Sequence, residues 1–178
     1  MEFPPSFKGH VVAVPFPTRD HVNTMINLCK SLSSKLPNEV IITVVVTQEL
    51  VSLVQSYPML HNIRYTTVPR LFPMDSIPKD DDVFSEHLST KMRLAFEYLL
   101  YQLEPPITAV IFDIELGWPA VIAKQMNISV ALLWTLSASF FETLRQLYIL
   151  TRDPNLSLGN EFTPVLLIIL NISIGIFS

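Results

Sequence analysis

The chain has 178 residues, of which 49% are hydrophobic and 16% are charged, and its formal net charge is -4. A chain of this length is about one domain long and can bury roughly 70% of its unfolded surface. The acidic balance, with a pI near 5.5, gives no electrostatic reason to expect a nucleic-acid partner. The single cysteine, Cys29, excludes an internal disulfide, a zinc site built from cysteines and an iron–sulfur cluster.

The hydrophobic pattern alternates between strand-like and helix-like segments along the chain. The apolar run 11–15 predicts a strand buried on both faces, and apolar residues at helical spacing follow it from Val22 to Leu32, with Asp20 as the expected N-cap. The continuous β-branched run 40–47 predicts a second strand. The remaining elements are expected to be a helix at 49–57, a strand at 63–68, a loop at 69–82, a long amphipathic helix between 84 and 103, a strand at 108–113, a helix at 118–126, a strand at 129–134 and a helix at 137–150.

Five strands that alternate with helices predict an α/β fold with a doubly wound, mainly parallel, Rossmann-like sheet. In such a sheet, ligands bind outside the carboxyl ends of the strands, at the point where the strand order reverses. His21 and Asp113 each lie at the carboxyl end of a predicted buried strand, so the two side chains can meet at that point. A histidine backed by a carboxylate is a general base for a hydroxyl group. The alternative is a histidine at a helix start and an unrelated aspartate in a loop.

Nucleotide-binding and metal-binding patterns are missing. Residues 15–20 contain no glycine, so neither the dinucleotide-binding fingerprint nor a P-loop follows the first strand. A nicotinamide-dependent or ATP-dependent enzyme is therefore disfavoured. We expect no metal site, because the acidic run 80–82 precedes a predicted helix, where the helix dipole favours negative charge, and His61 and His87 are isolated. His10 lies at the amino end of the first strand, away from the expected site.

Two stretches of the chain resemble plant UDP-dependent glycosyltransferases of family 1. The first consists of His10-Val-Val-Ala-Val-Pro-Phe-Pro17, His21-Val-Asn23 and Met25-Ile-Asn-Leu-Cys-Lys30, and the second of Val110-Ile-Phe-Asp113, Trp118 and Ala131-Leu-Leu-Trp-Thr-Leu-Ser-Ala138. The resemblance implies that residues 1–158 form the N-terminal, acceptor-binding domain of a two-domain GT-B-type enzyme. It implies that 159–178 form an atypical apolar tail and that the C-terminal UDP-sugar-binding domain is absent from the chain.

The same resemblance implies roles for individual residues. His21 is the expected base, Asp113 its orienting partner, and the acceptor oxygen attacks the anomeric carbon of a UDP-sugar, expected to be UDP-glucose, with inversion. The acceptor is expected to be a small apolar molecule such as a plant secondary metabolite, and no cofactor is implied. Thr135 aligns with a threonine that contacts the donor sugar. The candidates to line the acceptor pocket, with core packing as the alternative for each, are Phe84, Leu116, Trp118 and Phe140.

The chain departs from the family pattern in three places. Asp20 stands where many relatives have a glycine, and Thr24 stands where many have a proline. The box with a His-Cys-Gly-Trp-Asn core, which holds the nucleotide in these enzymes, does not occur in the sequence. We therefore expect the 178 residues to be inactive alone, and the alternative function is a non-catalytic small-molecule-binding or interaction protein.

The location and the apolar surface are also expectations. The first residues are acidic and rich in proline, unlike a secretory signal peptide, so a cytoplasmic location is expected. The apolar run 165–177 is too short as a helix, at about 1.5 Å per residue, to cross a hydrocarbon core of about 30 Å, so a collapsed tail is favoured over a membrane anchor. The low charge content indicates an apolar flank open to self-association.

Overall fold

The computed structural model describes residues 7–58, 60–71 and 81–151. Within them, five strands form one parallel sheet in the order β3-β2-β1-β4-β5. The strands are β1 (Gly9–Val14), β2 (Val40–Thr47), β3 (Ile63–Val68), β4 (Ala109–Asp113) and β5 (Ser129–Leu133). The predicted α/β fold with a parallel sheet is confirmed, and the strand order reverses between β1 and β4. The expected apolar tail lies outside the described residues.

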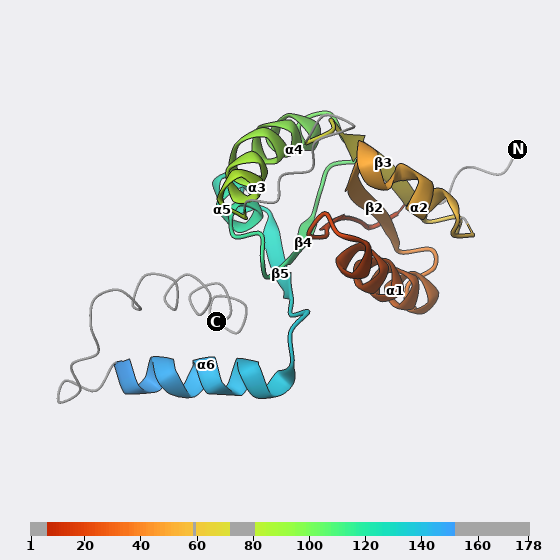
Figure 1. The fold of residues 1–178 in the computed structure, drawn as a ribbon. Helices are drawn as coiled ribbons and strands as arrows, with labels where there is room; N and C mark the ends of the chain where they lie inside the picture. Colours follow the sequence, from red (N-terminus) through yellow and green to blue (C-terminus); the bar gives the residue numbers. More distant parts are fainter. Residues whose placement is uncertain (1–6, 59, 72–80, 152–178) are drawn as a thin grey trace, which may run out of the picture.

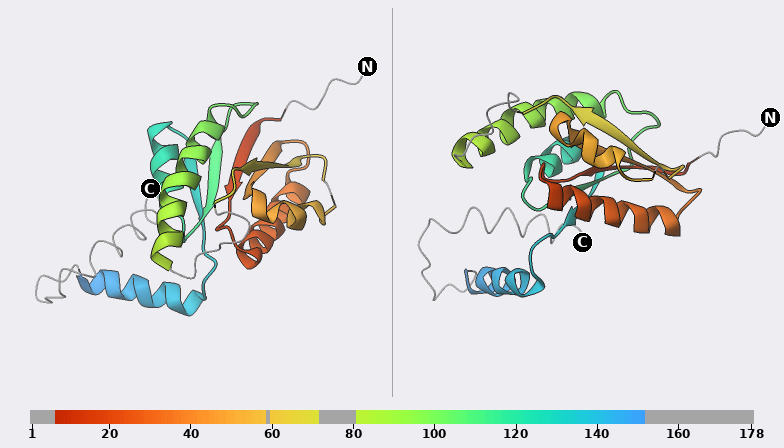
Figure 2. Two further views of the ribbon diagram at one scale, coloured as in Figure 1. Left: turned by 45° about the horizontal axis from the view of Figure 1, so that its top comes forward. Right: turned by 45° about the vertical axis from the view of Figure 1, so that its right-hand side comes forward.

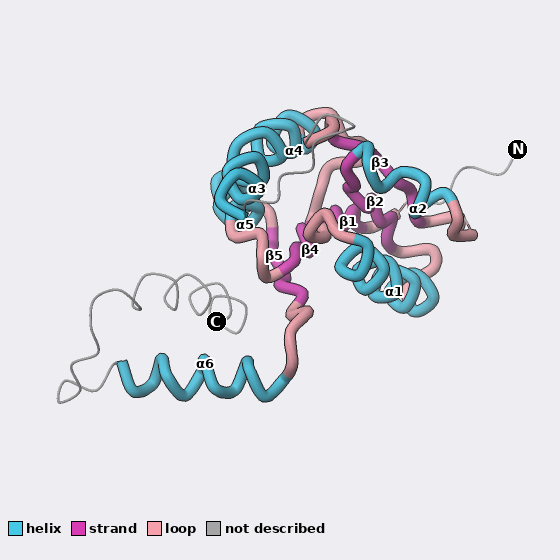
Figure 3. Tube along the Cα trace, in the orientation of Figure 1, coloured by secondary structure: helices cyan, strands magenta, loops and turns pink. Residues whose placement is uncertain are grey.

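Six α-helices connect the described strands or follow them, as the alternation of colours in Figure 3 shows. They are α1 (Arg19–Lys35), α2 (Val51–Gln55), α3 (Asp81–His87), α4 (Arg93–Leu100), α5 (Trp118–Gln125) and α6 (Ala138–Thr151). A 3-10 turn, Gln48–Leu50, leads into α2. Helices α1 and α2 cover one face of the sheet, and α3, α4 and α5 cover the other (Figure 1). The described part of the chain is therefore a three-layer α/β structure.

Helix α6 differs from the others because it lies apart from the three layers in all views of Figures 1 and 2. Two of its apolar side chains, Phe140 and Ile149, are 47% and 49% exposed, and Leu136 just before it is 41% exposed. The described part of the chain therefore exposes large apolar side chains, and the expected self-association through an apolar flank remains a prediction.

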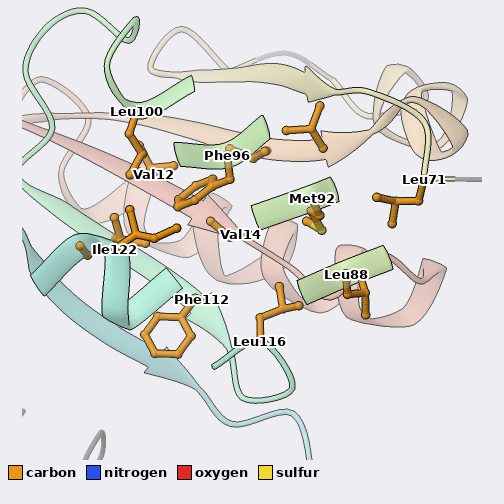
Figure 4. Packing of buried hydrophobic residues seen from close by; sticks show 14 residues of the cluster. Val12, Val14, Leu71, Leu88, Met92, Phe96, Leu100, Phe112, Leu116 and Ile122 are labelled. Atoms are coloured by element: carbon orange, nitrogen blue, oxygen red, sulfur yellow. The ribbon is translucent and has the colours of Figure 1, made fainter. Parts of the chain in front are cut away.

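Two hydrophobic clusters hold the layers together. The central strands are buried on both faces because successive side chains point to opposite sides of the sheet. Val12 and Val14 of β1 enter the cluster under α4 and α5, whereas Ala13 enters the cluster under α1. Figure 4 shows the first cluster, whose labelled members are Val12, Val14, Leu71, Leu88, Met92, Phe96, Leu100, Phe112, Leu116 and Ile122. The other cluster includes Cys29, and burial raises the pKa of its thiol to about 12, as expected for a structural cysteine.

The predicted long helix is interrupted by a π-helical turn, Leu88–Met92, between α3 and α4. Its buried residues recur every four positions, at Leu88, Met92, Phe96 and Leu100. An α-helix takes 3.6 residues per turn, so a four-residue repeat drifts by about 40° per step. The wider π turn compensates for part of this drift and keeps the buried stripe facing the sheet.

Helix α5 ends in a left-handed residue, Asn127, with φ of 56°. The amide of Ile128 bonds to the carbonyl of Ala123 at 2.8 Å, and the amide of Asn127 bonds to that of Lys124 at 3.1 Å. This pair of bonds is a Schellman motif, which asparagine supports because it tolerates the left-handed region. The motif directs the chain from α5 into β5, whose carboxyl end lies beside that of β4.

A buried polar network lies at the amino end of the sheet, opposite the candidate site. The fully buried His10 bonds through Nδ1 to the carbonyl oxygen of Pro105 (2.6 Å) and through Nε2 to the hydroxyl of Thr43 (2.7 Å). Because a carbonyl oxygen only accepts, Nδ1 carries the proton and Nε2 accepts from Thr43. Arg64 donates from Nε to the same hydroxyl at 2.7 Å. Burial lowers the pKa of His10, and the nearby Arg64 lowers it further, so the folded protein holds a neutral imidazole.

We therefore expect acid to destabilise the fold through His10. Its pKa in the folded state is below the unfolded value of about 6.5, so its contribution is complete above that pH and is lost as the pH falls below it. Urea unfolding at pH 7.5 and 5.5 should show a smaller pH effect in His10→Gln than in the wild type. The variant should also lose about 1–3 kcal/mol at pH 7.5, because buried partners of the imidazole are left unpaired.

The matched control is His61→Gln, because His61 is exposed and bonds only to the carbonyl of Pro37 in the described structure. Its stability should respond to pH as the wild type does. An unchanged pH effect in His10→Gln would contradict the assignment of a neutral, buried imidazole.

Candidate active site

The turn between β1 and α1 places the first site residue. The amide of Thr18 bonds to the carbonyl of Phe16 at 2.8 Å, and the amide of Val22 bonds to that of Thr18 at 3.0 Å, which starts the helix. The prediction of Asp20 as N-cap is wrong, because α1 begins at Arg19 and the extended Thr18 occupies the N-cap without a side-chain bond. Asp20 instead lies in the first turn, where the helix dipole favours its charge. No residue from 15 to 20 has a positive φ, so this turn forms without glycine.

The structure brings His21 and Asp113 together. His21 lies on the first turn of α1, and Asp113 is the last residue of the neighbouring strand β4. His21 Nδ1 is 2.7 Å from Asp113 Oδ2. The aspartate is fully buried, whereas the histidine side chain is 21% exposed. Because a carboxylate oxygen accepts, the proton lies on Nδ1, which leaves the lone pair on Nε2 for a ligand.

The second oxygen of Asp113 fixes the carboxylate from the other side. Oδ1 accepts from the backbone amide of Glu115 at 3.2 Å and from the hydroxyl of Thr135 at 3.4 Å. Thr135 follows β5. The site therefore takes one side chain from the carboxyl end of each of three neighbouring strands, β1, β4 and β5. The site is therefore a rigidly oriented His–Asp pair at the carboxyl edge of the sheet.

Aromatic rings and a second carboxylate adjoin the pair. The Phe16 ring centroid lies 5.3 Å from that of His21, and the Phe84 ring lies 5.8 Å from Phe16. Glu115 Oε1 is 4.0 Å from His21 Nε2, and its side chain is 38% exposed. The sequence interpretation missed Phe16 and Glu115. A signal was present, because both lie in the turns that directly follow β1 and β4, where ligands of this fold bind.

The four candidate acceptor contacts are dispersed. Phe84 lies near the site through its contact with Phe16, while Leu116 is 1% exposed and belongs to the core. Trp118 packs edge-to-face on Phe96 at 5.3 Å, and its buried Nε1 has no hydrogen-bond partner among the described residues. Phe140 lies on α6, with its ring 6.2 Å from that of Trp134. Leu116, and the side of the Trp118 ring that contacts Phe96, pack in the core, which is the alternative given for these residues above.

Metal clusters and membrane-spanning helices are both absent from the described residues. These residues contain no group of three or more His, Cys, Asp or Glu side chains arranged to hold a metal ion. They also contain no helix with the length and hydropathy needed to cross a bilayer.

Comparison with known proteins was made by sequence and by fold. UDP-glycosyltransferase 87A2 of Arabidopsis thaliana is 39% identical over 145 residues, which cover 79% of this chain and 32% of that protein. UDP-glycosyltransferase 87A1 of the same plant is 37% identical over 127 residues, covering 71% of this chain and 29% of that protein. This chain belongs to the plant UDP-glycosyltransferase family. No family model matches it.

Solved glycosyltransferases of GT-B architecture share the fold of this family member. A UDP-glucose:anthocyanidin 3-O-glucosyltransferase in complex with UDP superimposes with a TM-score of 0.68 at 18% identity, covering 94% of this chain and 44% of that one. Phytolacca americana UGT2, in complex with UDP-2-fluoro-glucose and pterostilbene, gives a TM-score of 0.62 at 21% identity, over 92% of this chain and 38% of that one. The chain spans about a third of the length of the curated relatives it matches.

Proposed function

We propose that residues 1–158 are the acceptor-binding domain of an inverting UDP-sugar-dependent glycosyltransferase. The observation that carries this proposal is the His21–Asp113 hydrogen bond of 2.7 Å at the carboxyl edge of the sheet. Membership of the UDP-glycosyltransferase family supports it. The acceptor is a small apolar molecule with a hydroxyl group, and the sugar donor is UDP-glucose.

In the proposed reaction, His21 acts on the acceptor. Nε2 takes the hydroxyl proton while the oxygen forms a bond to the anomeric carbon, and the bond from that carbon to the diphosphate breaks with its electron pair leaving on UDP. The imidazole becomes positively charged at this step. Asp113 stabilises that charge and holds the Nδ1–H tautomer, because its carboxylate is buried, fixed by two further bonds and 2.7 Å away.

The neighbouring residues take supporting roles in this proposal. Thr135 contacts the donor sugar while it donates to Asp113 Oδ1, so one hydroxyl links the donor side to the base. Of the four candidate acceptor contacts, Phe84 is supported by its ring contact beside His21, and Phe140 by its exposure on α6. Leu116 and Trp118 support the site from the core.

The direct test is a fusion of residues 1–158 to the C-terminal domain of a related plant UDP-glycosyltransferase. We expect the fusion to transfer glucose from UDP-glucose to a simple phenol, with inverted configuration at the anomeric carbon. A fusion that folds and binds both substrates without transfer would favour the alternative, a non-catalytic domain that binds an apolar small molecule.

A further inference from the structure

Glu115 occupies a fixed place next to the proposed base. It lies two residues after Asp113, and its backbone amide bonds to Asp113 Oδ1 at 3.2 Å. The next amide, of Leu116, bonds to the carbonyl of Asp113 at 2.9 Å, so the turn is held at both positions. The glutamate side chain is exposed, and its Oε1 is 4.0 Å from His21 Nε2. Its carboxylate makes no hydrogen bond within the described part of the chain.

We infer that Glu115 selects acceptors with two adjacent hydroxyl groups on an aromatic ring, that is, catechols. This inference rests on the proposed function. His21 Nε2 is an acceptor because the imidazole proton lies on Nδ1, and Glu115 Oε1 is an acceptor because it is a carboxylate oxygen. A single hydroxyl has one proton and satisfies only one of them. A second hydroxyl beside the first satisfies the other.

The spacing of the two acceptor atoms fits this class of molecule. A hydroxyl bonds to each acceptor atom at about 2.8 Å, and the oxygens of adjacent hydroxyls are about the same distance apart. Three distances of about 2.8 Å are involved: from Nε2 to the first hydroxyl oxygen, from that oxygen to the second, and from the second oxygen to Oε1. Together they span the observed 4.0 Å between Nε2 and Oε1. The two bonds then diverge slightly from the ring, as the hydroxyls of a catechol do.

The aromatic side chains favour a flat ring over an aliphatic diol. Phe16 lies 5.3 Å from the His21 ring, and Phe84 continues the aromatic surface at 5.8 Å from Phe16. Aromatic pairs at such separations stabilise each other beyond the area they bury. The surroundings of His21 therefore combine aromatic rings with a carboxylate, which matches a ring with adjacent hydroxyls.

The test is a calorimetric titration of the 178-residue chain with two neutral esters, methyl caffeate and methyl p-coumarate. They differ by one ring hydroxyl, so the ratio of their Kd values isolates the second hydrogen bond. We expect the wild type to bind the caffeate about tenfold more tightly, the difference that one bond to a charged group supplies. Glu115→Ala should remove this preference and leave the Kd for the coumarate unchanged.

The matched control is Glu39→Ala, because Glu39 is an exposed glutamate that pairs with Lys8 just before the amino end of β2. It should keep the tenfold ratio. Equal affinities in the wild type, an unchanged ratio in Glu115→Ala, an equal loss for both esters, or no binding of either would overturn the inference. The proposed function is judged separately, because transfer by the fusion protein to a phenol with one hydroxyl needs His21 and does not need a second hydroxyl.

Discussion

Replacing His21 by alanine in the fusion protein should lower kcat for glucose transfer to a phenol by about 10²–10⁴-fold, the range that general-base catalysis contributes. The variant loses the group that removes the hydroxyl proton and leaves the buried Asp113 carboxylate without its partner. Binding of UDP-glucose should change little, because the donor is held by other groups. The measurement is product formation at saturating concentrations of both substrates, at a pH near neutral.

His61→Ala is the control for this substitution. His61 lies after α2 and before β3, and it is exposed and bonds to the carbonyl of Pro37. Its kcat should equal that of the unsubstituted fusion. Full activity in the His21→Ala fusion, with an unchanged circular dichroism spectrum, would remove His21 from the mechanism.

The fold could be predicted because the buried strands have an unambiguous pattern. β2 is an unbroken β-branched run, and six of its eight residues are buried, as expected of a parallel strand covered on both faces. The π turn at Leu88–Met92 could not be predicted, because a repeat of four apolar positions also fits an α-helix. The π turn is favoured only because Leu88, Met92, Phe96 and Leu100 must all face the same sheet.

The first residue of α1 also could not be predicted from local sequence preferences. Thr18 and Asp20 are both residue types that favour an N-cap, so local preference does not choose between them. The choice is made by the bond from the Val22 amide to the Thr18 carbonyl, which depends on how the chain leaves β1. Because the turn is short, an error of two residues in the cap did not move His21 out of the first helical turn.

The central pair of the site could be predicted from topology, and its surroundings could not. His21 lies just after β1 and Asp113 ends β4, and these strands turn out to be neighbours, so the sheet itself brings the two residues together. Leu116 and Glu115 are adjacent in one short turn, yet the first is buried in the core and the second faces His21. No periodic pattern in a turn of this length indicates which side chain points inward.

The 178-residue chain alone should not transfer glucose from UDP-glucose, even though it contains the proposed base. A base accelerates transfer only when the anomeric carbon is held within about 3–3.5 Å of the attacking oxygen, and such positioning is worth roughly 7–11 kcal/mol. The sequence has no glycine in the β1–α1 turn and no His-Cys-Gly-Trp-Asn box, so no nucleotide-binding motif lies beside His21. Thr135 donates to Asp113, and in the function proposed above it contacts the sugar of the donor.

Calorimetry and a product assay test this expectation on the same sample. UDP-glucose should give no measurable heat with the isolated chain, while a phenolic acceptor should bind, because the chain itself supplies the Phe16 ring and the His21–Asp113 pair of the proposed acceptor site. The fusion protein, assayed in parallel, should bind both molecules and form product. Turnover by a monodisperse preparation of the isolated chain that disappears in His21→Ala would contradict the prediction, because it would mean that these residues hold the donor without a second domain.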